Sequence, residues 1–298
     1  MSVLKAALIG NNIAHSISPR VHEELFRVLA PRAGSAFSSL DYTLNDCDEK
    51  CDLADWLKKA RNNGLTGANV TIPFKGDAWP LVDETDVAAS VLESINTIAF
   101  NGNVKGASTD GEGFLQALLR EHPEFNLEKY HVICLGAGNT SRAVLYSLCT
   151  RWMPKTLTIV NRTLEHAEDL ANFCVAQAPG PTVQIMSFAD LEKYAEPRYR
   201  LVLQTTPVGS VTEPGNLAAG FAWDELDFAI DLTYKPLQTP FLAAAQEAGA
   251  KTMNGLGMLI EQAALSQQYW LTGELAATSP LSDEEYQTIK ARLEKELM

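Results

Sequence analysis

The sequence predicts an α/β protein of two domains, on the strength of three observations. At 298 residues the chain is long for a single hydrophobic core. Strand-like apolar segments alternate with helical segments through its first third, which is typical of a parallel sheet. Farther along, the strand at 131–135 runs into a glycine-rich turn and then a helix, which begins another α/β unit.

The composition narrows the class of protein. A hydrophobic content of 46% and a charged content of 20% are ordinary for a globular protein. The net charge of −13 argues against nucleic acid or an anionic membrane as a partner. No apolar run approaches the roughly 20 residues that a membrane helix needs. The chain enters a strand-like run directly, so we expect no signal peptide.

Cysteines and histidines point to a cytoplasmic protein without a metal. The five cysteines are odd in number and scattered, which favours reduced thiols in the cytoplasm. The five histidines are isolated, without the spacing of a metal site.

The first third begins as β-α-β-α-β. We expect a strand over Val3–Ile9, a helix over Arg20–Leu29, a strand around Tyr42–Leu44, a helix over Asp52–Asn62 and a strand over Gly67–Ile72. A helix over Asp83–Leu92 and a strand over Ser94–Phe100 follow. Asn101-Gly102 then predicts a hairpin to Val104–Ala107, so we expect one edge of this sheet to be antiparallel.

Polar side chains stand where the first strand ends. Ser16 and Ser18 alternate around Ile17, so both hydroxyls can face one side and bind a polyhydroxylated ligand. Alternatively, Ser18 caps the following helix, with Pro19 at its first position.

Lys75 follows the strand at 67–72 and the helix-breaking Pro73, at the sheet rim where ligands bind in α/β proteins. A partly desolvated lysine can act as an acid or base, although a solvated loop lysine is the commoner case. Asp110 stands where a strand gives way to a helix, Phe114–Arg120. It is either a helix cap or the carboxylate partner of Lys75.

Two amide side chains can each be interpreted in two ways. Asn96 lies in a buried strand and Gln262 on the apolar helix Met258–Leu271. A buried amide is costly unless hydrogen-bonded, so each is either a bonded core group or a ligand contact.

The glycine-rich turn predicts a Rossmann-like dinucleotide-binding domain. The strand His131–Leu135 leads into Gly136-Ala137-Gly138-Asn139-Thr140 and a helix, and a second strand, Thr156–Val160, follows. Gly136 permits the tight turn, and Gly138 lets the backbone approach a pyrophosphate at the helix N-terminus. Ser141 stands at the third glycine of the usual fingerprint.

The residues after the second strand favour NADP over NAD. NAD sites usually carry Asp or Glu there, whereas this chain has Asn161, Arg162 and Thr163. Arg162 can pair with a 2′-phosphate or stack on adenine. His166 is either a third contact or simply an exposed helix residue.

The rest of the chain continues the α/β pattern. We expect strands near Leu201–Leu203, Asp227–Leu232 and Lys251–Met253, a helix over Phe241–Ala248, and a charged amphipathic helix over Glu284–Glu296 that packs on the first domain.

Several motifs in one order resemble the shikimate dehydrogenase family. They are Ala14-His15-Ser16-Ile17-Ser18-Pro19, Ala68-Asn69-Val70-Thr71-Ile72-Pro73-Phe74-Lys75, Asn96-Thr97, Thr109-Asp110-Gly111, Gly136-Ala137-Gly138, Asn161-Arg162-Thr163 and Gly255-Leu256-Gly257-Met258-Leu259. The resemblance spans Ile9 to Gln262. It implies reversible, NADPH-dependent reduction of 3-dehydroshikimate to shikimate, a step of aromatic amino-acid and chorismate biosynthesis.

The resemblance also implies the domain boundaries. A substrate domain over residues 1–112 would be completed by 255–298, and an NADP-binding domain would occupy 113–254. The sequence leaves the oligomeric state open between a monomer and a homodimer.

By position, Lys75 and Asp110 would form the acid–base pair. Ser16 and Ser18 would bind the substrate carboxylate. The remaining substrate contacts would be Asn69, Thr71, Asn96, Tyr234 and Gln262. The cofactor contacts would be Gly136, Ala137, Gly138, Asn139, Thr140, Asn161, Arg162, Thr163, His166, Thr205, Leu232 and Gly255.

Some positions depart from the family pattern. His166 replaces a second arginine that members preferring NADP often carry, and Thr205–Gly209 replaces the usual run beside the nicotinamide. Ser108 stands in place of Asn, Leu232 in place of Met and Ile95 in place of Val. These changes leave NAD use and quinate oxidation open. The alternatives are therefore a quinate or shikimate dehydrogenase that uses NAD, and a cofactor-binding sensor without catalysis.

Overall fold

The computed structural model describes residues 2–48, 50–178, 180–191, 194 and 198–298. The chain forms two compact units. Unit 1 comprises Met1–Gln116 and Leu259–Leu293, and unit 2 comprises Ala117–Met258 and Glu294–Met298. Each contains a six-stranded sheet in which parallel pairs predominate, so the predicted two-domain α/β class is confirmed.

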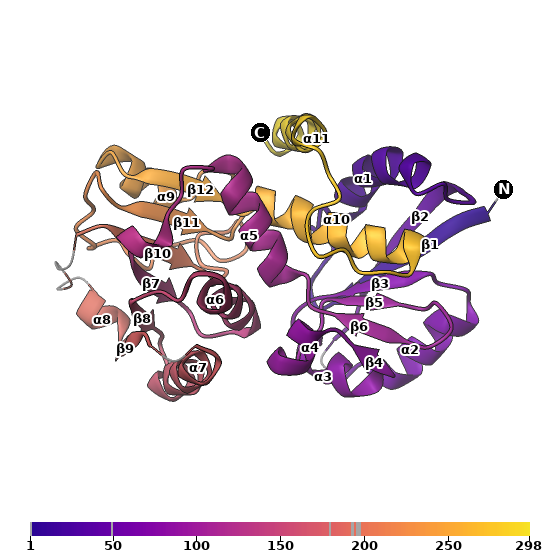
Figure 1. Cartoon of the computed structure of the whole chain (residues 1–298), viewed down its shortest axis with the longest axis horizontal. Coiled ribbons are helices and arrows are strands. Elements are labelled where there is room, and N and C mark those ends of the chain that lie inside the picture. The colour runs from indigo at the N-terminus through magenta and orange to yellow at the C-terminus, as the bar shows by residue number, and fades with distance from the viewer. Residues whose placement is uncertain (1, 49, 179, 192–193, 195–197) are drawn as a thin grey trace. The chain divides into compact units, whose positions relative to one another are not determined.

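The sheet of unit 1 has the order β2-β1-β3-β5-β6-β4 (Figure 1). Its strands are β1 Ser2–Gly10, β2 Phe37–Asp46, β3 Gly67–Val70, β4 Glu84–Thr85, β5 Thr97–Ala99 and β6 Lys105–Ala107. β1 pairs in parallel with β2 and β3, whereas β5 is antiparallel to both β3 and β6. The predicted hairpin is thus present, but it lies inside the sheet because β4 adds a further edge strand.

Helices cover both faces of this sheet. They are α1 Ser18–Arg32, α2 Leu53–Asn62, α3 Lys75–Ala78, α4 Val87–Leu92, α5 Asp110–Glu121, α10 Leu256–Thr272 and α11 Asp283–Leu297. Leu53 and Leu57 of α2 pack with Val70 and Ile98 in one apolar cluster. A second cluster joins Leu4 of β1 to Trp270 of α10.

The helix expected over 83–92 is shorter than predicted. Asp86 caps α4, because its carboxylate accepts a hydrogen bond of 3.1 Å from the Ala89 N–H. The residues before this cap form β4 instead.

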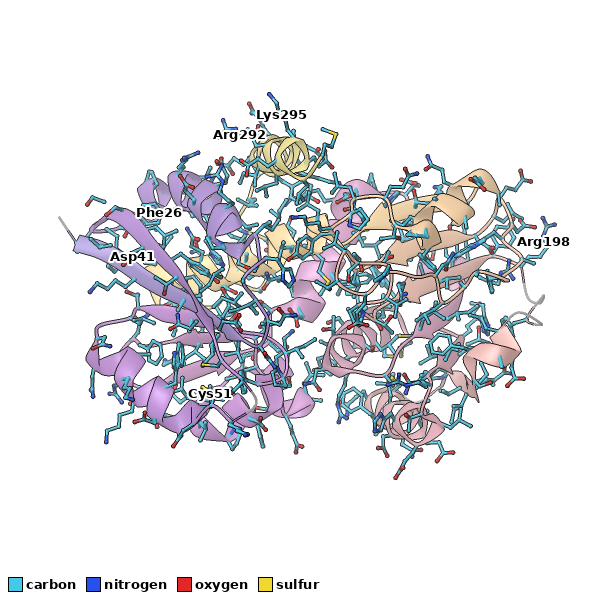
Figure 2. All side chains as sticks on the ribbon, turned by 180° about the vertical axis from the view of Figure 1, so that it is seen from behind. Phe26, Asp41, Cys51, Arg198, Arg292 and Lys295 are labelled. Atoms are coloured by element: carbon cyan, nitrogen blue, oxygen red, sulfur yellow. The ribbon has the colours of Figure 1, made fainter. Side chains whose placement is uncertain are left out.

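Helix α11 packs on unit 1, as predicted from its amphipathic sequence. Arg292, labelled in Figure 2, donates a hydrogen bond of 2.7 Å to Glu24 of α1. Tyr286, Ile289 and Leu293 form its buried stripe.

The sheet of unit 2 has the order β12-β11-β10-β7-β8-β9, and every pair is parallel. Its strands are β7 His131–Leu135, β8 Thr156–Val160, β9 Thr182–Met186, β10 Arg200–Gln204, β11 Phe228–Asp231 and β12 Lys251–Asn254. Its helices are α6 Asn139–Trp152, α7 Leu164–Gln177, α8 Phe188–Leu191 and α9 Pro240–Glu247. This strand order is that of the doubly wound dinucleotide-binding fold.

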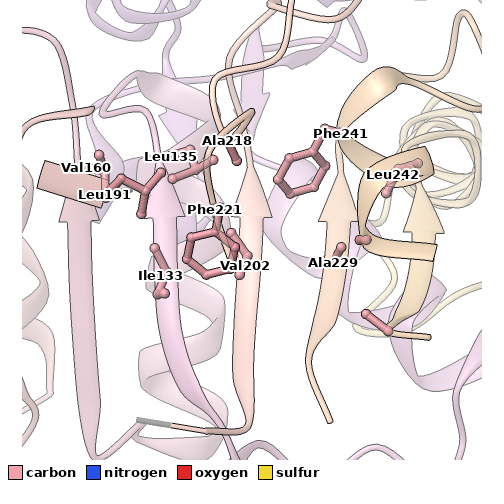
Figure 3. Packing of buried hydrophobic residues seen from close by; sticks show 12 residues of the cluster. Ile133, Leu135, Val160, Leu191, Val202, Ala218, Phe221, Ala229, Phe241 and Leu242 are labelled. Atoms are coloured by element: carbon pink, nitrogen blue, oxygen red, sulfur yellow. The ribbon is translucent and has the colours of Figure 1, made fainter. Parts of the chain in front are cut away.

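One core cluster of unit 2 is drawn in Figure 3. Phe221 and Phe241 pack with Ile133, Val202 and Ala229 from three neighbouring strands. These strands are buried on both faces and therefore read as continuous apolar runs in the sequence. Because β7, β10 and β11 run parallel to one another, their carboxyl ends lie at one edge of the sheet. Ligands bind at this edge in such folds.

Within the described residues, no helix has the length and apolar character needed to cross a membrane. The same residues contain no group of three or more His, Cys, Asp or Glu side chains placed to hold a metal ion.

Candidate functional site

Lys75 and Asp110 form a buried ion pair in unit 1. Lys75 Nζ donates a hydrogen bond of 2.5 Å to Asp110 Oδ2, although the two residues are 35 positions apart in the chain. Lys75 is 8% exposed and Asp110 is 7% exposed. The sequence left two roles open for Asp110, a helix cap and the carboxylate partner of Lys75. The structure shows the second. Water is largely excluded from this pair, which strengthens their interaction.

Asn96 binds the other oxygen of Asp110. Its Nδ2 donates hydrogen bonds of 2.7 Å to Asp110 Oδ1 and 3.2 Å to Gln262 Oε1. Its Oδ1 accepts a hydrogen bond of 2.8 Å from the Thr109 N–H. Gln262 in turn donates to the Leu259 carbonyl at 3.0 Å. Both predicted amides are therefore hydrogen-bonded within the protein and lie beside the ion pair.

The two serines of the first loop face one another. Ser16 Oγ donates a hydrogen bond of 3.0 Å to Ser18 Oγ and accepts one of 3.2 Å from the Ser18 N–H. Helix α1 begins at Ser18 without a side-chain cap, so the alternative of Ser18 as a helix cap is wrong. Both serines are partly buried and belong to unit 1.

Thr71 closes the end of strand β1. A Cβ added to Gly10 would lie 2.3 Å from Thr71 Cγ2, so only glycine fits there. The Thr71 N–H donates a hydrogen bond of 2.9 Å to the Ile9 carbonyl. The predicted strand at 67–72 ends at Val70, because the chain turns at Thr71 into α3.

Asn69 is 6% exposed, and its amide is held on all sides by the protein. Its Oδ1 accepts hydrogen bonds of 2.9 Å from both Tyr42 and His22. Its Nδ2 donates to the Asn96 carbonyl at 3.2 Å and to Ser266 at 3.1 Å. The amide therefore connects the serine side of unit 1 to the Asn96 side, and its predicted contact with substrate stays a prediction.

The glycine-rich turn of unit 2 joins β7 to α6. Gly136 has a φ of +110°, and a Cβ there would lie 2.8 Å from Thr205 Oγ1, so this position requires glycine. Ser141 occupies the third fingerprint position: its hydroxyl lies 2.7 Å from Thr205 Oγ1 and accepts a hydrogen bond of 3.2 Å from the Gly138 N–H. Serine thus ties the turn to the end of β10, a contact that glycine could not make.

This turn fits a pyrophosphate. Gly138 is exposed, and a Cβ added to it would meet no atom within 4 Å. It caps α6, a helix of 14 residues, and the N–H groups of the first turn of a helix are the ones left without intrahelical partners. Ala137, Asn139 and Thr140 border it and are exposed or partly buried.

The residues predicted to select the cofactor follow β8. Asn161 Nδ2 donates a hydrogen bond of 2.8 Å to the Thr163 carbonyl, which shapes the turn into α7. Arg162, Thr163 and His166 are exposed, so the side chains predicted to contact the 2′-phosphate are accessible.

Three further predicted residues lie after β11 or β12. The Gly255 N–H donates a hydrogen bond of 3.0 Å to the Thr233 carbonyl. A Cβ on Gly255 would lie 2.0 Å from the carbonyl oxygen of Leu232, so the two backbones touch. Tyr234 is partly buried. All of these residues belong to unit 2.

Three further side chains, His22, Tyr42 and Ser266, belong to this polar network, and no sequence motif indicated them. Ser266 had a recognisable signal, because it follows Gln262 by one helical turn and so shares its face. His22 and Tyr42 lie in a helix and a strand whose neighbours in the sequence carry no related polar pattern, so only the fold reveals their contact.

Comparisons with known proteins agree with this architecture. The profile of the shikimate dehydrogenase substrate binding domain matches residues 8–98, and that of shikimate / quinate 5-dehydrogenase matches residues 118–210. The chain is 35% identical over 266 residues to the shikimate dehydrogenase (NADP(+)) of Carboxydothermus hydrogenoformans, covering 88% of this chain and 90% of that one.

Solved structures give the same result. A shikimate dehydrogenase in complex with NADP+ superposes with a TM-score of 0.82 at 28% identity, covering 99% of this chain and 96% of the other. The quinate dehydrogenase of Corynebacterium glutamicum in complex with NAD superposes with a TM-score of 0.79 at 25% identity, covering 98% and 100%. With two family profiles and a relative above 30% identity across most of its length, this chain belongs to the shikimate dehydrogenase family.

Proposed function

We propose that this protein is an NADP-dependent shikimate dehydrogenase, which interconverts 3-dehydroshikimate and shikimate. The buried pair of Lys75 and Asp110 carries the proposal, because a cation held beside a carboxylate and a polar network suits proton transfer to a carbonyl oxygen. The curated relatives named as NADP(+) shikimate dehydrogenases support the choice of substrate and cofactor.

NADPH, when bound, supplies the hydride. Its diphosphate would lie at the turn of Gly136 and Gly138, and Arg162 would face the 2′-phosphate. Ala137, Asn139, Thr140, Asn161, Thr163, His166, Thr205, Leu232 and Gly255 would complete this contact surface.

In the proposed mechanism Lys75 gives a proton to the substrate oxygen as negative charge develops there, and takes it back in the reverse direction. Asp110 holds the ammonium in place, and Asn96 fixes the orientation of Asp110 through its second oxygen. Ser16 and Ser18 bind the substrate carboxylate. Ring hydroxyls and flanking groups are bound by Asn69, Thr71, Asn96 and Gln262, and Tyr234 lies near the carboxylate end.

A quinate dehydrogenase that uses NAD is the second candidate. His166 occupies the place of a second arginine, which weakens selection for a 2′-phosphate. The quinate dehydrogenase of Corynebacterium glutamicum, with NAD, shares the fold over nearly the whole chain.

The deciding experiment measures steady-state oxidation of shikimate and of quinate, each with NADP and with NAD. We expect kcat/KM to be highest for shikimate with NADP. A higher value for quinate with NAD would establish the second candidate. Binding of NADPH without turnover of either acid would indicate the cofactor-binding sensor. The Lys75→Met variant, assayed in parallel, shows whether any activity belongs to this protein.

We further propose a cytoplasmic location, because all five cysteines are free thiols, as a reducing compartment requires. A monomer and a homodimer both suit the proposed activity, and size-exclusion chromatography with light scattering separates them.

A further inference from the structure

The orientation of the Asn69 amide is fixed by its neighbours. Its Nδ2 lies 3.2 Å from the Asn96 carbonyl oxygen, which can only accept a hydrogen bond. The amide nitrogen must therefore face Asn96, and the amide oxygen must face His22 and Tyr42. Two donors converge on this one oxygen, each at 2.9 Å.

The same reasoning fixes the tautomer of His22. Since Asn69 Oδ1 is an acceptor, His22 Nε2 carries the hydrogen, and Nδ1 of the neutral ring must accept. Gln267 supplies that donor: its amide nitrogen donates to His22 Nδ1 at 2.8 Å and to the His22 carbonyl at 3.1 Å, and its oxygen accepts from the Phe26 N–H at 2.8 Å. Burial lowers the pKa of His22 to about 4, so the ring stays neutral near pH 7.

Tyr42 connects this buried group to the serine loop. Its hydroxyl donates to Asn69 Oδ1, and the Ser18 side chain is a further hydrogen-bond partner of this hydroxyl. Its ring stacks on His22 with centroids 4.5 Å apart, and His22 stacks on Trp270 at 4.9 Å. Burial raises the pKa of Tyr42, so its phenol keeps the proton that it donates.

Two arrangements of protons are open to these groups, one without a bound anion and one with it. In the first, Ser18 donates to Tyr42 and Tyr42 donates to Asn69. In the second, Ser18 turns its proton toward an anion and Tyr42 turns its proton toward Ser18, while His22 alone serves Asn69. No heavy atom moves, and the second chain of donors is polarised toward the negative charge.

We propose that Tyr42 is a positioning residue for recognition of the substrate carboxylate, and that His22 and Asn69 hold Tyr42 in place. This inference rests on the proposed function, in which Ser16 and Ser18 bind that carboxylate. Ser16 donates to the Ser18 oxygen in the free protein, and Tyr42 supplies the hydrogen bond that this oxygen accepts once the Ser16 and Ser18 protons have both turned to the ligand. The free-energy cost of turning the Tyr42 proton is small, because Asn69 Oδ1 keeps the hydrogen bond from His22 throughout.

The test compares an acid and a neutral analogue in the Tyr42→Phe variant, which keeps the stacked ring and removes only the hydroxyl. We expect KM for shikimate to rise roughly tenfold and kcat to stay within about twofold. For shikimate methyl ester, which lacks the negative charge, we expect KM to change less than about twofold. The matched control is Tyr269→Phe, a tyrosine of the same apolar cluster, which should leave both KM values unchanged.

A second variant keeps the test independent of any effect on folding. In a Ser18→Ala background the Tyr42→Phe change should no longer raise KM for shikimate, because the hydroxyl that it positions is gone. An equal rise in KM for acid and ester, a fall in kcat at constant KM, or a full effect without Ser18 would each overturn the inference. If the unmodified protein oxidises no shikimate at all, the proposed function fails as well, whereas normal activity with an unaffected Tyr42→Phe variant overturns this inference alone.

Discussion

Asn96 donates a hydrogen bond of 2.7 Å to Asp110 Oδ1, the carboxylate oxygen that does not face Lys75. Both oxygens of Asp110 are thus engaged, one by a cation and one by an amide. Asn96 is itself fixed by Thr109 and Gln262, so the carboxylate has little freedom to turn. In the proposed mechanism this arrangement positions the lysine for proton transfer, and it leads to the first prediction.

Replacing Lys75 with Met should lower kcat for shikimate oxidation by about 10³-fold, because general acid–base catalysis typically contributes 10²- to 10⁴-fold. Met keeps the aliphatic stem in a site that is 8% exposed. KM should change less than about threefold, since in the proposed mechanism Ser16 and Ser18, rather than Lys75, bind the carboxylate. The matched control is Lys59→Ala on the exposed face of α2, which should retain full activity. A Lys75→Met enzyme with near-normal kcat would refute the proposed mechanism.

The two glycines of the turn should respond differently to alanine. Gly138→Ala should keep its thermal stability, because the added methyl meets no protein atom, but KM for NADPH should rise at least about tenfold through a clash with the diphosphate. Gly136→Ala should instead unfold at a lower temperature, since its φ is +110° and its Cβ would press on Thr205. Thermal melts and cofactor titrations separate the two effects. Unaltered NADPH binding by Gly138→Ala would place the diphosphate elsewhere.

Arg162→Ala should lower kcat/KM for NADPH by about 10- to 100-fold and change the value for NADH much less, because a charged hydrogen bond to the 2′-phosphate contributes roughly 1.5–3 kcal/mol. The ratio of the two kcat/KM values is the measurement. The control is Arg151→Ala, which replaces an exposed arginine in the last turn of α6. Equal losses with both cofactors would show that Arg162 contacts the adenine or merely supports the fold.

His131 should make the folded state sensitive to acid. Burial, assisted by the charge of Arg200, lowers its pKa from 6.5 to about 4, so the unfolded chain binds a proton more tightly than the folded one. Its contribution is therefore fully present above pH 6.5 and is lost as the pH falls toward 4, up to roughly 2–3 kcal/mol.

The measurement is urea unfolding of the wild type and of His131→Leu between pH 7 and pH 4.5. Thr158 and Tyr194 remain partners in the variant, because their hydroxyls already lie 3.2 Å apart. The variant should lose less stability than the wild type over this range. If the free energy of unfolding fell equally with pH in both proteins, His131 would not be the source of the acid sensitivity.

Much of the architecture was readable from local pattern. The strands β7 and β8 have the predicted bounds, because buried parallel strands are short apolar runs with clear ends. The helix predicted over 83–92 begins only at Val87, since the cap at Asp86 and the two-residue strand before it depend on pairing with β6. Ser18 resembled a helix cap in sequence, yet its oxygen accepts a hydrogen bond from the Ser16 hydroxyl and caps no helix N–H group.

The sequence by itself determined the α/β class, the glycine-rich turn and the identity of Lys75 and Asp110 as candidates, because periodicity and motif order are properties of neighbouring residues. Only the tertiary structure decided that Lys75 and Asp110 meet, that the Asn69 amide is enclosed by protein groups, and that His22 and Tyr42 share its oxygen. Those contacts join residues up to 245 positions apart, as between His22 and Gln267. Local preference cannot specify such pairs, since they form only when the sheet and the returning helix α10 bring distant segments together.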